Sequence, residues 1–120
     1  MKQYQRAALA LAVLKLEKND SVNSVYDYNQ STHPNISGHA NDREIKLYDY
    51  DRGAFFDGSF NGTEFSLYDY EHCEFISLKK ISDGKYEGYH YGSSSYFEIT
   101  LRGNNVSFYD YGTGEFYDFS

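Results

Sequence analysis

Tryptophan is absent from this 120-residue sequence, and proline, cysteine and methionine each occur once. A single cysteine cannot form an internal disulfide, so the composition is compatible with a reducing compartment. Basic residues are also scarce: 11 lysines and arginines stand against 18 aspartates and glutamates, which gives a net charge of −7. Such a chain lacks the concentrated basic surface that a nucleic-acid backbone requires. We therefore expect no nucleic-acid partner.

Long apolar segments are missing as well. The most apolar run, residues 7–14, is too short to cross a bilayer. Lys15, Glu17 and Lys18 follow this run, where a secretory signal would carry small residues for cleavage. We expect a helix that belongs to the fold, no membrane association and a cytoplasmic location, with secretion as the less favoured alternative.

Sequence motifs for catalysis or metal binding are also missing. The chain has no glycine-rich phosphate loop, no G-x-S-x-G and no H-E-x-x-H, and its four histidines form no local cluster with the only thiol. Cys73 lies in an expected turn between Glu71 and Glu74, and nearby carboxylates disfavour the reactive thiolate. We expect no enzyme activity, no catalytic residues, no metal site and no cofactor.

Aromatic residues, by contrast, are abundant, with 14 tyrosines and nine phenylalanines. They recur in a repeat of about twenty residues, and a Tyr-X-Tyr motif starts each unit. The five motifs are Tyr26-Asp27-Tyr28, Tyr48-Asp49-Tyr50, Tyr68-Asp69-Tyr70, Tyr89-His90-Tyr91 and Tyr109-Asp110-Tyr111. The residue five positions after the second tyrosine is Phe55, Phe75, Tyr96 or Phe116 in the last four units and His33 in the first.

Each unit predicts a β-hairpin. The four residues between the second tyrosine and the later aromatic residue fit a two-residue turn, which pairs Tyr50 with Phe55. In this register Asp57 lies opposite Tyr48. Turn-forming pairs such as Asn61-Gly62 separate the units, so the five hairpins predict an antiparallel meander of about ten strands.

The N-terminal segment differs from the repeats. Residues 3–18 are rich in alanine, leucine, lysine and glutamate and predict a helix with Leu9, Val13 and Leu16 on one apolar face. We interpret residues 1–120 as a single domain of the mainly β (α+β) class, with the helix at 3–18 and hairpin repeats over 24–120. About ten strands form a sheet wider than one helix can cover. We therefore expect a strongly curled or barrel-like sheet around the helix, or a homodimer.

Alternation along the strands separates an apolar face from a tyrosine-rich face. The apolar face, expected to pack on the helix, comprises Val25, Ile36, Ile45, Leu47, Phe56, Phe60, Phe65, Leu67, Ile76, Leu78, Phe97, Ile99, Leu101, Phe108 and Phe119. The other face carries the candidate binding residues Tyr48, Tyr50, Phe55, Asp57, Tyr68, Tyr70, Phe75, Tyr89, Tyr91, Tyr96, Tyr109 and Tyr111. The motif aspartates point to the apolar side beside the turns, where we expect a solvated rim that hinders aggregation.

The segment YDYDRGAFF, residues 48–56, resembles the Tyr-Asp repeats of large bacterial shell-forming toxins, which have hairpins of similar length. The resemblance covers a few residues per unit and implies a hairpin repeat, without implying a function. The chain departs from that pattern because Gly53 comes one position early and no arginine follows it. Choline-binding hairpin repeats of similar length depend on tryptophan, which is absent.

The tyrosine-rich face is the main indication of function. Tyrosine combines a large apolar area with a hydrogen-bonding tip at low entropic cost. Three acidic residues lie among the tyrosines: Asp57, Glu98 and Asp118, expected opposite Tyr48, Tyr89 and Tyr109. They favour a basic protein partner, through cation–π and charge-assisted contacts. We therefore expect a small, acidic, non-catalytic interaction module that binds another protein through this face. The alternatives are a glycan-binding repeat domain and a self-assembling dimer with no ligand.

Overall fold

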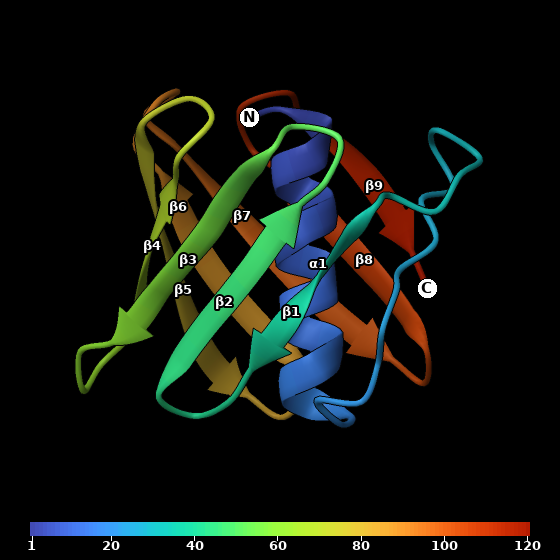
Figure 1. The fold of residues 1–120 in the computed structure, drawn as a ribbon, viewed down its shortest axis with the longest axis horizontal. Coiled ribbons are helices and arrows are strands. Elements are labelled where there is room, and N and C mark those ends of the chain that lie inside the picture. The colour runs from blue at the N-terminus through green and yellow to red at the C-terminus, as the bar shows by residue number, and fades with distance from the viewer.

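The computed structural model describes residues 1–120 and contains one helix and one antiparallel sheet (Figure 1). Helix α1 spans Gln3–Glu17. The nine strands are β1 (Ile36–Ala40), β2 (Glu44–Asp49), β3 (Ala54–Phe60), β4 (Phe65–Asp69), β5 (Glu74–Ser82), β6 (Lys85–His90), β7 (Ser95–Arg102), β8 (Asn105–Asp110) and β9 (Glu115–Phe119). Their order in the sheet equals their order in the sequence, which confirms the meander.

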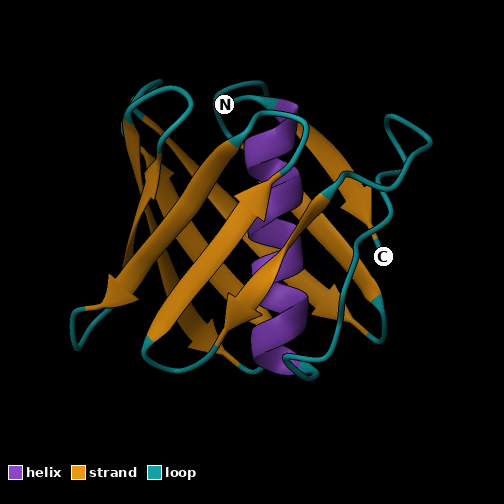
Figure 2. Ribbon diagram, viewed as in Figure 1, coloured by secondary structure: helices purple, strands orange, loops and turns teal.

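The sheet curls around α1, so the helix runs along the inside of the strands (Figure 2). Residues 7–14 are all buried, with at most 4% of any of them exposed. The expected single apolar face was therefore wrong, since the helix is buried on every side from residue 7 to residue 14. The physical reason lies in the run itself, which has no charged residue, because a helix that is apolar all round must be enclosed. Nor is α1 long or apolar enough to cross a membrane.

The two edge strands, β1 and β9, do not pair with each other. Residues 26–35 lie between them at the end of the sheet that holds the helix N-terminus. Tyr26 exchanges two backbone hydrogen bonds with Ser120, at 2.7 and 3.0 Å, and Asp27 forms isolated bridges with Phe119 and Thr32. The first repeat unit therefore contributes these bridges and β1 rather than two full strands, which reduces the expected ten strands to nine.

The expected two-residue turns within the repeat units were wrong. Tyr48 lies opposite Phe55 and Asp49 opposite Ala54, so residues 50–53 form a four-residue loop. Oδ1 of Asp49 accepts the backbone N–H groups of Asp51 and Arg52 at 3.0 and 3.1 Å, which stabilises this loop. The register differs from the expected one by two residues. Because side chains alternate with a period of two, the assignment of faces is unaffected.

The buried core agrees with the expected apolar face, apart from two residues at strand ends. Phe60, the last residue of β3, is 43% exposed, and Leu101, near the end of β7, is half-buried. Tyr86, Val106 and Tyr117 are buried as well, although the sequence analysis did not place them in the core.

A polar cluster fixes the C-terminal end of α1. Oε1 of Glu17 accepts the Gly84 backbone N–H, and its Oε2 accepts the Tyr86 hydroxyl at 2.7 Å and pairs with Lys80 at 2.8 Å. Burial opposes the ionised carboxylate, but the hydrogen bonds from Lys80, Tyr86 and Gly84 outweigh it and lower the pKa of Glu17. The helix is thus anchored to the β5–β6 hairpin.

Candidate binding surface

Each repeat unit builds the same cluster of three aromatic rings on the outer face of the sheet. The first tyrosine of the motif packs against the second tyrosine and against the aromatic residue opposite it on the next strand. The five clusters are Tyr26/Tyr28/His33, Tyr48/Tyr50/Phe55, Tyr68/Tyr70/Phe75, Tyr89/Tyr91/Tyr96 and Tyr109/Tyr111/Phe116. Ring centroids within a cluster lie between 4.6 and 4.9 Å apart, mostly edge to face. We call these fifteen residues the aromatic band.

The band lies around the end of the sheet that holds the helix N-terminus. All the β2–β3, β4–β5, β6–β7 and β8–β9 loops, which carry the second tyrosines, gather at that end (Figure 1). The first tyrosines, Tyr48, Tyr68, Tyr89 and Tyr109, are half-buried beneath their neighbours. The expected binding residues Tyr50, Phe55, Tyr70, Phe75, Tyr91, Tyr96 and Tyr111 are between 44% and 64% exposed. The exposed part of each cluster is therefore a pair of rings braced by a third.

Acidic side chains lie among the clusters, with partners that differ from those expected. Asp57 lies opposite Lys46 and Tyr68 rather than Tyr48. Glu98, expected opposite Tyr89, lies opposite Glu87 on β6 and Tyr109 on β8. Similarly, Asp118 lies opposite Ser107 rather than Tyr109.

The Glu87–Glu98 pair places two carboxylates on directly opposed positions beside the aromatic band. Together with Tyr96 and Tyr111 it lines a shallow hollow on the outer face. Burial and the negative charge of Glu98 raise the pKa of the Tyr111 hydroxyl. Directly opposed like charges destabilise a sheet, so this pair gains from a cation at its surface. Glu87 is not among the expected binding residues, because its position opposite Glu98 follows only from the observed register.

The central residues of the five motifs form a second ring, on the inner face. Asp27, Asp49, Asp69, His90 and Asp110, called here the polar ring, are at most 5% exposed. The expected solvated rim was therefore wrong. These side chains surround the first turn of α1, whose polar side chains supply partners to Asp27, Asp69 and Asp110.

The two carboxylate oxygens of the polar ring have separate roles. Oδ1 accepts backbone N–H groups of the following loop in Asp27, Asp49, Asp69 and Asp110. Oδ2 faces the helix and accepts hydrogen bonds from its side chains. Oδ2 of Asp27 accepts one from Gln3, that of Asp69 accepts one each from Tyr4 and Gln5, and that of Asp110 accepts two from Arg6. Burial, followed by the hydrogen bond to Asp69, raises the pKa of Tyr4, so its hydroxyl stays protonated as a donor.

His90 reproduces both roles with its ring nitrogens. Nδ1 accepts the Ser93 backbone N–H at 3.2 Å, as Oδ1 does elsewhere, and Nε2 bonds to Glu74. Burial lowers the pKa of His90, which favours the neutral ring that an accepting Nδ1 requires. The arrangement Glu74–His90–Ser93 thus serves to cap the β6–β7 loop.

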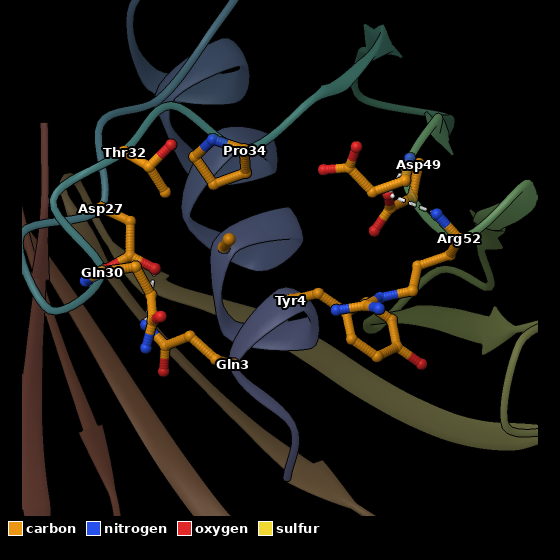
Figure 3. A pocket seen from close by; sticks show the side chains of 10 residues that line it. Gln3, Tyr4, Asp27, Gln30, Thr32, Pro34, Asp49 and Arg52 are labelled. Atoms are coloured by element: carbon orange, nitrogen blue, oxygen red, sulfur yellow. Dashed lines mark hydrogen bonds between the residues drawn. The ribbon is translucent and has the colours of Figure 1, made fainter.

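One cleft opens between the first repeat unit and the β2–β3 loop, above the first turn of α1 (Figure 3). It has a volume of about 260 Å³, and Asp27 and Gln30 lie on one side of it, with Asp49 and Arg52 on the other. The sequence gives no indication of this cleft, because it lies between elements that are brought together only by the curling of the sheet.

The remaining candidates for chemistry are dispersed. Cys73 is exposed in the β4–β5 loop, with φ 54°, as expected of a turn residue. No three histidine, cysteine or acidic side chains are grouped closely enough to hold a metal ion. The arrangement thus offers two candidate recognition surfaces: the outer aromatic band and the inner cleft.

Comparison with known proteins identifies no relative: no family model matches the chain, nor does any curated protein or solved structure.

Proposed function

We propose that this chain is a non-catalytic interaction module, and that its aromatic band binds a protein with a basic surface. The observation that carries the proposal is the repetition of exposed aromatic pairs, each braced by a half-buried tyrosine. Contiguous exposed apolar surface is typical of interaction sites. Because the rings of a cluster hold one another in place, little side-chain entropy is lost when a partner binds.

Charge indicates the kind of partner. The chain has a net charge of −7, and Glu87 and Glu98 lie beside Tyr96 and Tyr111 on the outer face. A lysine or arginine side chain entering this hollow meets both a carboxylate pair and aromatic faces, which is the combination that cation–π and charge-assisted contacts require. The surface is convex, so a single flat partner reaches only neighbouring clusters.

The proposal is tested with a peptide of alternating arginine and glycine, compared with the same peptide carrying glutamate. We expect saturable binding of the arginine peptide only, and weakening at least tenfold when salt is raised from about 0.05 M to about 0.5 M, because exposed charges are screened. Replacing Tyr96 and Tyr111 together by serine should remove most of this binding. The control is Phe60→Ser with Ile81→Ser, two apolar side chains that are 43% and 45% exposed at the opposite end of the sheet.

The alternatives give different results in the same set of measurements. Exposed rings beside carboxylates also suit sugar stacking, so cellohexaose is titrated while tyrosine fluorescence is recorded. Binding of this neutral sugar without binding of the arginine peptide would replace our proposal by a glycan-binding function. Light scattering tests the third alternative. If the molar mass doubles as the protein concentration rises, and stays that of the monomer in the Tyr96/Tyr111 variant, the aromatic band would instead be the interface of a homodimer.

A further inference from the structure

The cleft above the first turn of α1 holds the one polar-ring aspartate whose inner oxygen has no protein donor. In Asp27, Asp69 and Asp110, Oδ2 accepts a hydrogen bond from a side chain of the helix. Asp49 is 5% exposed, and its only side-chain hydrogen bonds are the two that Oδ1 accepts from its loop. Because every fully enclosed side-chain oxygen has a partner, Oδ2 of Asp49 must be accessible from the cleft.

The equivalent position in the last repeat unit indicates which group suits this oxygen. Nε and Nη2 of Arg6 donate to Oδ2 of Asp110 at 3.1 and 3.0 Å, and the Arg6 guanidinium lies 3.8 Å from the centroid of the Tyr117 ring. The same fold therefore already places a guanidinium on a buried ring carboxylate beside a tyrosine. At the cleft, Tyr4 lines the space next to Asp49 (Figure 3).

The charge of the cleft favours a cation. Its lining includes the carboxylates of Asp27, Asp49 and Asp51 and one guanidinium, that of Arg52, which lies over the Tyr4 ring at 4.7 Å. Burial raises the pKa of Asp49, so its ionised form is stabilised by an incoming positive charge. Since no three ligands are grouped for a metal ion, an organic cation is the better match.

We propose that this cleft binds the guanidinium group of an arginine side chain supplied by another molecule, with Oδ2 of Asp49 as the principal acceptor. The walls formed by residues 27–34 and by the β2–β3 loop enclose the group, and the Gln30 amide offers a further acceptor opposite Asp49. This site lies on the inner face, separate from the aromatic band. The proposal therefore does not depend on the function proposed above, and either can fail alone.

The test uses N-acetyl-arginine amide as the probe and N-acetyl-citrulline amide as its neutral analogue of equal shape. Backbone amide signals of Asp51 and Arg52, which donate to Asp49, are followed by NMR during titration. We expect saturable shifts with the arginine probe and affinity at least about tenfold lower for citrulline, because a charge-assisted hydrogen bond is lost. Ethylguanidinium, which has no peptide groups, should shift the same signals.

Two variants separate the specific acceptor from the general negative charge. Asp49→Asn keeps an oxygen for the loop amides, so the loop survives, and it should lower the affinity at least about tenfold. Asp51→Asn removes the same charge from an exposed position and should change the affinity by less than about threefold, because exposed charges are screened. If the unmodified protein binds the citrulline and arginine probes with equal affinity, the proposal is overturned. Equal binding by Asp49→Asn, or the absence of saturable shifts, also overturns it.

Discussion

The ion pair between Arg6 and Asp110 allows a quantitative test of how the polar ring holds the helix inside the sheet. Replacement of Arg6 by methionine keeps a long unbranched side chain but removes both donors to Oδ2 of Asp110. Asp110 is 1% exposed, and its carboxylate then retains one donor, the Gly112 backbone N–H at 2.8 Å. The variant therefore leaves a buried negative charge without a counter-ion.

The expected loss of stability is set by the smaller of two free-energy costs: leaving the buried carboxylate charged and unpaired, or protonating it. Removing one partner of a buried ion pair costs about 3–5 kcal/mol. The carboxylate can take up a proton instead, which at pH 7 costs about 4 kcal/mol for an aspartate with a reference pKa near 3.9. We therefore expect Arg6→Met to lower the free energy of unfolding by about 3–4 kcal/mol at pH 7. At pH 5 the proton costs only about 1.5 kcal/mol, so the deficit should at least halve.

Urea unfolding, followed by far-ultraviolet circular dichroism at both pH values, measures this deficit. The control adds Asp110→Asn to Arg6→Met, since asparagine still accepts the Gly112 N–H but has no charge. It should recover about 2 kcal/mol, because an uncharged amide is far easier to bury than an unpaired carboxylate. A deficit below about 1 kcal/mol at pH 7, or one independent of pH, would show that this ion pair does not anchor the helix.

Three further predictions concern other parts of the fold. Hydrogen bonds lower the pKa of Glu17 below its ordinary 4.5, so the stability that Glu17 contributes is present above that pH and is lost on acidification. Glu17→Gln should therefore flatten the fall in the urea midpoint between about pH 5 and about pH 3. Gly58→Ala should cost about 2–4 kcal/mol or prevent folding, since its Cβ would lie 1.9 Å from the Ser66 carbonyl oxygen, and a shift in thermal midpoint of less than about 2 °C would contradict this. Asn61→Ala should cost about 1 kcal/mol in urea unfolding, because two backbone N–H groups of the β3–β4 loop lose their acceptor, and an unchanged midpoint would refute that role.

The fold could be predicted to a large extent because side-chain alternation determines the faces independently of the exact register. The shift from a Tyr50–Phe55 to a Tyr48–Phe55 pair changes every partner between β2 and β3, yet it moves no residue to the other face. The loop length could not be derived from the spacing of aromatic residues alone. It depends on the hydrogen bonds that Asp49 accepts from the loop backbone, a local feature that the Asp in four of the five motifs does encode.

The candidate site was predictable only in part. The exposed tyrosines of the aromatic band follow from their position in the repeat, and the structure places them together as clusters. Burial of the motif aspartates was missed because it depends on a helix that is enclosed on all sides. Their partners Gln3 and Arg6 are distant in sequence, with Arg6 and Asp110 separated by 104 positions. No pattern in a single sequence reports contacts of that range.

The enclosure of α1 also constrains the order of events when the chain is synthesised. The helix precedes every strand, yet it packs against β7, β8 and β9 as well as β1, so its cover is complete only after the last hairpin has formed. Until then the apolar residues 7–14 are open to other chains, and such intermediates aggregate readily. Contacts of this sequence separation also slow folding. A nascent chain arrested before β9 therefore leaves α1 incompletely covered, with the apolar surface that chaperones recognise still exposed.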